Sequence, residues 1–200
     1  MASVSRLVLV LLAVPAGGLG GQWLIGADVT AIWFGGTSYD TSAASDDESF
    51  RPHRPTSFGL GVDKRFTKIG VGLRLSYAEA AVADEGAAGF LGLNDFFTCY
   101  EVAPELSYRV ARTGTGAEFR AHGGPLLDLW SVTGDDGLRS RWGAHAAVSV
   151  EFPFGRRLVG ALRAGGALTP SVFKPGELPG NFVRQTMRRG AVSLGLRYRL

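Results

Sequence analysis

The sequence lacks the residues on which several protein classes depend. It has a single cysteine, Cys99, so it can form no intramolecular disulfide and offers no second thiol for a zinc site. It also has no phosphate-binding glycine loop, no CxxC pair and no metalloprotease helix motif. Cys99 is therefore interpreted as a small apolar residue rather than a reactive thiol.

Long hydrophobic runs are missing as well. The apolar run at 7–15 is far shorter than the roughly 20 residues that a membrane-spanning helix needs. It follows Arg6 and precedes small residues at 16–21, which is the order of a secretory signal peptide. We expect residues 1–20 to be a cleaved signal peptide and residues 21–200 to be the mature domain. The alternative is a membrane-anchoring helix from Leu7 to about Ala27, which Pro15 and several glycines would interrupt.

The charge is not concentrated on one sign. The 21 lysines and arginines nearly balance the 18 acidic residues, and the net charge is +3. Basic residues cluster only at 183–189 and at Arg197 and Arg199. Nucleic-acid-binding proteins gather positive charge into one patch or stripe. We therefore expect no nucleic-acid partner.

Glycine, in contrast, is abundant. The 29 glycines lie inside apolar segments, and 46% of the residues are hydrophobic, which excludes disorder for most of the chain. Glycine destabilises helices, whereas repeated glycine in strands marks crowded faces or bends. An ordinary helical domain is therefore unexpected.

After residue 22 the dominant pattern is an alternation of apolar and polar residues, which is typical of strands with one apolar face. In the last segment Leu194 and Leu196 lie on one face, and Arg197 and Arg199 lie on the other. The same pattern predicts strands over eight segments: 24–34, 57–66, 69–77, 98–110, 117–130, 141–154, 158–168 and 191–200.

The connections between these segments alternate in length. Short turns are expected at 67–68, 111–116 and 155–157, and longer, mostly polar or glycine-rich loops at 35–55, 78–95, 132–138 and 169–187. Short turns on one side and long loops on the other are typical of outer-membrane barrels. The predicted fold is all-β: a closed eight-stranded antiparallel up-and-down transmembrane β-barrel.

A soluble barrel would show the same alternation, but two features favour an apolar face that points outward. Most of the predicted strands are long enough to cross a bilayer when tilted. Aromatic residues also occupy both ends of the apolar face, as in the interfacial girdles of membrane barrels. These are Trp33, Phe58, Tyr77, Tyr100 and Trp142 toward the long loops, and Phe66, Tyr108, Phe119, Phe152, Phe154 and Tyr198 toward the short turns.

The composition of the polar face is a third indication. It carries charges of both signs and no lysine, as expected of an enclosed network, because the arginine fork makes several hydrogen bonds and is weakly hydrated. Inward glycines would leave room for these long side chains. The expected members are Arg65, Arg74, Arg109, Arg120, Arg141, Arg163, Arg197 and Arg199, with Asp28, Asp63, Glu101, Glu105, Glu118, Asp128 and Glu151.

Together these features resemble the small bacterial outer-membrane β-barrel family, which includes the OmpA membrane domain, OmpX and OmpW. The resemblance is architectural and covers nearly the whole mature chain. It implies a final strand that carries an assembly signal, and Leu194, Leu196 and Tyr198 match the expected alternation. Leu200 departs from the usual aromatic ending.

Two histidines raise the question of catalysis. A tight type I′ turn at Asp136–Gly137 would place Asp128 opposite His145. The same register would place Glu151 opposite His122. Such pairs could support general-base or metal chemistry. We favour a buried hydrogen-bond network instead, because the face points inward, lipid substrates lie outside, and no serine has a nucleophile context.

No catalytic, cofactor-binding or metal-ligating residue is assigned. The acidic stretch at 45–49 and the pair Asp135–Asp136 lack the ordered spacing of a calcium loop, and His53 is interpreted as a solvated loop residue. We expect a non-catalytic, monomeric outer-membrane protein that acts in envelope structure or surface interaction. Its expected partners are outer-membrane lipid, lipopolysaccharide and the assembly machinery. The alternatives are a narrow channel or small-ligand carrier, and a lipid-modifying enzyme.

Overall fold

A computed structural model describes residues 21–35, 38–40, 49–53, 55–86, 89–134, 137–174, 177 and 182–200. The predicted signal peptide, residues 1–20, lies outside this part of the chain, as do most of the acidic stretch at 45–49 and the pair Asp135–Asp136. Within the described ranges, no helix is long and apolar enough to cross a bilayer.

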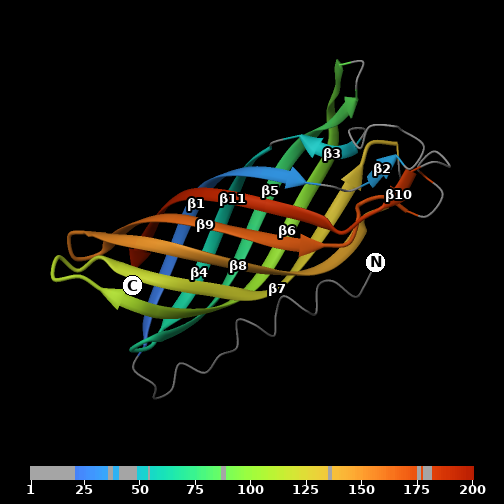
Figure 1. The fold of residues 1–200 in the computed structure, drawn as a ribbon. Helices are drawn as coiled ribbons and strands as arrows, with labels where there is room; N and C mark the ends of the chain where they lie inside the picture. The colour runs from blue at the N-terminus through green and yellow to red at the C-terminus, as the bar shows by residue number, and fades with distance from the viewer. Residues whose placement is uncertain are drawn as a thin grey trace.

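Eight long strands form a closed antiparallel barrel (Figure 1). They are β1 (Gln22–Gly35), β4 (Thr56–Arg65), β5 (Ile69–Gly86), β6 (Gly89–Arg112), β7 (Glu118–Val132), β8 (Arg139–Phe154), β9 (Leu158–Thr169) and β11 (Met187–Arg199). Each long strand pairs with the next one along the chain, and β1 pairs with β11 from Leu24↔Arg199 to Gly35↔Arg188, which closes the barrel. The predicted architecture is confirmed.

Additional strands lie at the long-loop end of the barrel (Figure 1). The short strands β2 (Ser38–Asp40) and β10 (Phe182–Arg184) pair with each other, and β3 (Ser49–His53) pairs with β5. The prediction of a loop over 78–95 is wrong, because β5 and β6 continue through this region as a paired hairpin up to Gly86↔Gly89. Backbone hydrogen bonds hold such a hairpin together, so it persists where the alternation in the sequence has faded.

The opposite end of the barrel carries the short turns. Gly116 and Gly155 have φ angles of +86° and +81°, a left-handed conformation that glycine adopts at little cost. The last residue, Leu200, lies at this end, and its backbone N–H donates to the carbonyl of Trp23 at 3.0 Å (Figure 1). The described chain therefore enters and leaves the barrel on the short-turn side.

The two faces of the strands differ as the sequence predicts. Large apolar side chains point outward and stay exposed, including Leu194 at 70%, Leu60 at 64% and Val148 at 62%. Outward aromatic residues lie toward both ends, for example Trp142 at 61% and Phe154 at 62% exposed. The charged side chains assigned to the polar face line the interior instead. The barrel is thus apolar outside and charged inside.

Glycines make room for these charges, as expected. Gly59 pairs with Asp28, and a Cβ atom at Gly59 would lie only 2.7 Å from the Asp28 carboxylate oxygen. Gly72 faces Asp63 in the same way on the next strand pair. A larger residue at either position would collide with a carboxylate that forms an ion pair across the barrel.

The interior changes character at the long-loop end, where it is apolar. There a buried cluster, hereafter the mouth cluster, replaces the charges. Cys99 belongs to this cluster, which agrees with its interpretation as a small apolar residue. The members are Ile32, Phe34, Ala78, Ala80, Phe97, Cys99, Trp130, Val132, Val172 and Met187.

Candidate functional site in the barrel interior

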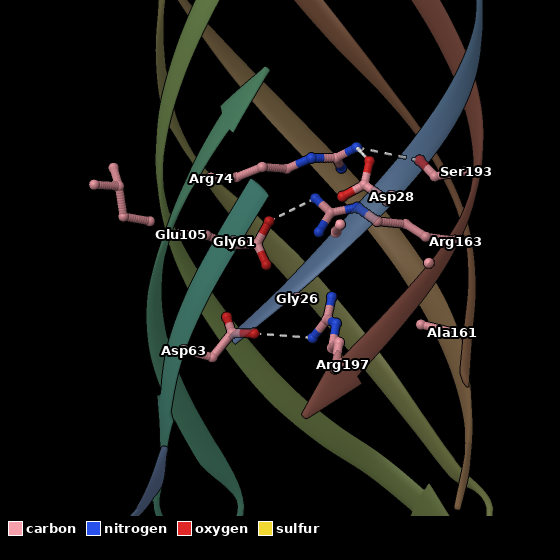
Figure 2. Close-up of a pocket in the computed structure, with 13 residues that line it drawn as sticks. Gly26, Asp28, Gly61, Asp63, Arg74, Glu105, Ala161, Arg163, Ser193 and Arg197 are labelled. Carbon is pink, nitrogen blue, oxygen red and sulfur yellow. Dashed lines mark hydrogen bonds and ion pairs between the residues drawn. The ribbon is translucent and has the colours of Figure 1, made fainter. Parts of the chain in front are cut away.

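An arginine at mid-barrel connects three strands (Figure 2). Arg74 on β5 donates to the carboxylate of Asp28 and, at 2.9 Å, to the hydroxyl of Thr30, both on β1. The same guanidinium lies 3.3 Å from Ser193 Oγ on β11. Arg74 therefore links β5 to β1 and β11, strands that are far apart in the sequence.

A second arginine crosses the barrel at a similar depth (Figure 2). Arg163 on β9 donates to Glu105 Oε2 on β6 at 2.5 Å. The other oxygen of Glu105 lies 2.6 Å from His122 Nδ1. Arg163, Glu105 and His122 are all buried, so solvent ions screen the Arg163–Glu105 ion pair only weakly.

The charges are denser toward the short turns. Arg65 makes two parallel hydrogen bonds to Glu151, at 2.5 and 2.8 Å, the bidentate geometry for which arginine is suited. Arg197 bridges Asp63 at 3.0 Å and Glu151 at 3.1 Å. Glu151 is 2% exposed, so its two cationic partners take the place of water.

Two further groups complete the network. Near the short turns, Arg109 and Arg120 both donate to Glu118 at 3.1 Å. Toward the loops, Arg189 donates to Glu101 and approaches Asp128 at 3.4 Å. The interior charges thus form successive layers that extend from the short turns to the base of the mouth cluster.

The space left between these layers is small. One cavity of about 30 Å³ lies among Asp28, Asp63, Arg74, Arg163 and Arg197 (Figure 2). A second, of about 60 Å³, lies on the loop side of Arg74 and is lined in part by Glu101 and Arg189. Such volumes hold a few water molecules at most, so little open space lies beside these ion pairs.

The predicted pairing of histidines with carboxylates is wrong. Asp128 pairs with Arg141 rather than with His145, and Glu151 pairs with Glu118 rather than with His122. The cause is the observed register between β7 and β8, whose last pair is Trp130↔Arg139 and which differs by four residues from the register that a tight turn at 136–137 would impose.

The observed register instead gives His122 two other partners. Its Nε2 lies 2.7 Å from Ser149 Oγ, and its Nδ1 lies 2.6 Å from Glu105. This serine–histidine–carboxylate order is that of hydrolase triads, and the expectation that no serine has a nucleophile context is wrong. Ser149 is only 2% exposed, however, and Glu105 is already engaged by Arg163. The arrangement is a buried hydrogen-bond network.

Within the described part of the chain, no group of three histidine, cysteine, aspartate or glutamate side chains is placed to hold a metal ion. His145 lies on β8 two residues from Ala147, the pairing partner of His122. Its Nε2 is buried at the edge of the 60 Å³ cavity without a hydrogen-bond partner among the described residues. The side chain of His53 lies outside the described set.

Comparison with known proteins places this arrangement in context. No protein-family model matches the chain, and no curated protein does either. Solved structures do match. The outer-membrane protein OprG from Pseudomonas aeruginosa aligns over 92% of this chain and 98% of its own, at 14% identity and a TM-score of 0.59. Neisserial surface protein A aligns over 90% and 99%, also at 14% and 0.59.

The N-terminal β-barrel domain of Pseudomonas aeruginosa OprF gives a third match, with 90% and 100% coverage, 12% identity and a TM-score of 0.51. These alignments run through the whole length of each neighbour. The chain has the fold of the small bacterial outer-membrane β-barrels. At these identities the likeness concerns the fold, and the chemistry of this outer-membrane-type barrel rests on its own side chains.

Two interior arginines of this outer-membrane-type barrel were not among the predicted members of the polar face. Arg189 contacts Glu101 and Asp128, and Arg139 makes two hydrogen bonds of 2.7 Å with Glu177. Both lie two residues before the start of a predicted strand. Extending the alternation of 141–154 and 191–200 back by one step would have found them, since each has the parity of the inward arginines that follow.

Proposed function

We propose that the protein is a non-catalytic outer-membrane barrel with a plugged polar interior, which acts in envelope structure or in surface interactions through its long loops. The observation that carries this proposal is the stack of interior ion pairs, with cavities of only about 30 and 60 Å³ between them. An eight-stranded barrel is just wide enough for side chains to fill. Here long arginines that cross the lumen fill it.

The test of the plug is electrical. In planar bilayers the folded protein should show little steady conductance, because the interior layers leave no wide water path. Large, stable and reproducible openings would contradict the plugged interior. They would promote the second candidate function, a narrow channel or small-ligand carrier.

The location is part of the same proposal. The outward aliphatic band between aromatic ends suits a bilayer, and the structural neighbours are bacterial outer-membrane proteins. Cell fractionation should recover the protein in the outer membrane, and it should migrate differently on gels before and after boiling. Recovery as a detergent-independent periplasmic protein would contradict an outward apolar band in contact with lipid.

The proposed topology places the short turns in the periplasm and the long loops outside the cell. Tags near Ser45 and Gly176 should then be reachable on intact cells, whereas a tag near Gly114, in a short turn, should be protected. The opposite labelling pattern would reverse the assignment.

The absence of turnover is proposed on the burial of the Ser149–His122–Glu105 group. A fluorophosphonate probe, which reacts with activated serines, should leave Ser149 unlabelled in the folded protein. Labelling that is lost in Ser149→Ala would favour an enzyme. The proposed partners are outer-membrane lipid and lipopolysaccharide at the outward band, and the assembly machinery that inserts the strands. The protein is proposed to be a monomer.

A further inference from the structure

The mouth of the barrel contains an apolar cup. Inward side chains from β1, β5, β6, β7 and β11 form it, and they are the members of the mouth cluster other than Val172. Trp130 lies in its floor, edge-on to Phe34 and to Phe97 with ring centroids 5.9 Å apart in each case. A charged lumen that ends in a buried apolar cup needs an apolar occupant, because water in such a cup would lack hydrogen-bond partners.

The present occupant is part of the same chain. Val172, which belongs to no strand, is completely buried in the cluster. Phe173 packs its ring against Phe97, with centroids 6.1 Å apart. The segment after β9 therefore fills the cup with two consecutive apolar side chains.

Polar bonds at the rim hold this segment in place. Arg139 donates to the carbonyl of Val172 at 3.1 Å, and Arg141 donates to the carbonyls of Ser171 and Val172 at 2.6 and 3.2 Å. Arg139 also makes its two hydrogen bonds with Glu177. We call residues 171–174 and Glu177 the latch segment. The described hydrogen bonds of this segment to the barrel come from side chains at the rim, whereas the strands are paired along their backbones.

With the latch segment in place, one buried hydrogen-bond donor in the cup is still unsatisfied. Among the described residues, the indole Nε1 of Trp130 has no hydrogen-bond partner, although the side chain is completely buried. The Trp130 side chain borders a void of about 10 Å³ shared with Cys99, Glu101 and Arg189, which is at the lower limit for a water molecule. Buried donors without partners are rare and costly. An occupant that brought an acceptor oxygen to this point would satisfy the indole, which valine and phenylalanine side chains cannot do.

The charges beneath the floor restrict the kind of acceptor. Arg189 already has two carboxylates beside it, Glu101 and Asp128. A third anion would therefore meet repulsion rather than an unpaired cation. We propose that the cup binds an uncharged small molecule with an apolar body and one carbonyl or hydroxyl oxygen, which displaces Val172 and Phe173 and accepts a hydrogen bond from Trp130 Nε1. The body of the ligand should match the combined volume of the two displaced side chains.

The probe for this proposal is a medium-chain methyl ketone that carries a photoreactive diazirine, applied to the folded protein in lipid nanodiscs. Crosslinks mapped by mass spectrometry should appear on cup residues such as Phe97 and Met187, and an excess of unlabelled ketone should suppress them. Labelling of the outward wall should not saturate, because it reflects partition into lipid. Labelling of the cup that does not saturate would overturn the proposal.

Two variants test the chemistry of the floor. Trp130→Phe keeps an aromatic ring but removes the donor, so it should weaken ketone binding by roughly tenfold, as expected for one hydrogen bond. It should leave the binding of an alkane diazirine of equal length within about twofold, a difference below the energy of one hydrogen bond. Trp142→Phe, at an outward rim position, is the matched control and should change neither. Equal losses for ketone and alkane would overturn the role of the indole.

A third variant tests the latch and does not depend on the floor. Arg139→Gln removes the ion pair with Glu177, so a larger fraction of molecules should have an open cup. The apparent affinity for the ketone should then rise by roughly threefold to tenfold, because the apparent dissociation constant equals the intrinsic one divided by the fraction of molecules with an open cup. Unchanged or weaker binding in a folded Arg139→Gln protein, verified by its heat-dependent gel mobility, would show that the latch segment does not compete for the cup.

Discussion

Glu151 and Phe97 both point into the barrel and are both almost completely buried, but their surroundings have little in common. Glu151 is held by the guanidinium groups of Arg65 and Arg197 near the short turns. Phe97 is held by the rings of Trp130 and Phe173 at the loop end. One fold therefore uses two kinds of core along a single axis.

The two cores fail in different ways. In an ion-pair layer each charge depends on a particular partner, and removing one partner leaves an uncompensated buried charge. In an apolar cup no side chain has a unique partner, so changes that conserve volume are tolerated and changes that introduce charge are not. The following predictions test this difference, from the largest expected effect to the smallest.

The largest effect is expected from a charge placed in the cup. Ala78→Asp adds a carboxylate at a buried position in the mouth cluster, where the cation that borders the same small void, Arg189, is already paired with Glu101 and Asp128. We expect a loss of more than about 4 kcal/mol in the free energy of unfolding, measured by urea titration of the protein in lipid vesicles. Ala78→Val is the control for size and should cost about 1–3 kcal/mol. Equal losses for the two variants would show that volume, not charge, limits this site.

The next effect concerns the layer near the short turns. Glu151→Ala leaves Arg65 and Arg197 without the carboxylate that they share. The expected loss is about 3–5 kcal/mol, since the buried guanidinium of Arg65 loses its bidentate partner, while Arg197 keeps Asp63. Glu79→Ala removes an exposed carboxylate and should change the same urea midpoint very little. A Glu151→Ala protein as stable as the unmodified one would mean that water replaces the ion pair.

Arg74 is expected to matter less than Glu151, because its side chain and that of Asp28 are partly exposed, at 16% and 19%. Arg74→Ala removes the link between β5 and the β1–β11 pair and should cost about 2–3 kcal/mol, the range for hydrogen bonds to charged groups. Asp47→Ala, in the 35–55 connection, is expected to cost far less. Equal losses in the free energy of unfolding for Arg74→Ala and Asp47→Ala would show that the Arg74 link does not stabilise the barrel.

How much of this could be read from the sequence differs between the two cores. The alternation in segments such as 191–200 predicts which charges point inward, because side chains in a strand alternate strictly between faces. It does not predict partners. Arg65 and Glu151 are 86 residues apart, and their encounter depends on the stagger of the closed barrel. The register that a tight turn at 136–137 would set differs from the observed one, and this difference alone gives both histidines the wrong predicted partners.

The apolar cup could be predicted only in part. Around Trp130 and around Phe34 the sequence is mostly apolar on both faces of the strand, which indicates that the inward face carries few charges there. The latch segment carries no such signal, because Val172 and Phe173 lie outside any strand, and their place in the barrel mouth follows from tertiary packing alone.

The smallest effect is expected at the boundary between the latch and the solvent. The side chain of Glu177 is 31% exposed, so its pair with Arg139 should contribute no more than about 1 kcal/mol. Glu177→Ala should therefore change the urea midpoint only slightly. It should also leave the conductance in planar bilayers at its low value, because the Arg189, Arg163, Arg74 and Arg65 ion pairs still fill the lumen below the cup. A pore that opens in Glu177→Ala would show that the latch, rather than the ion-pair layers, closes the barrel, and the charged half would then have to be wide enough for water to pass.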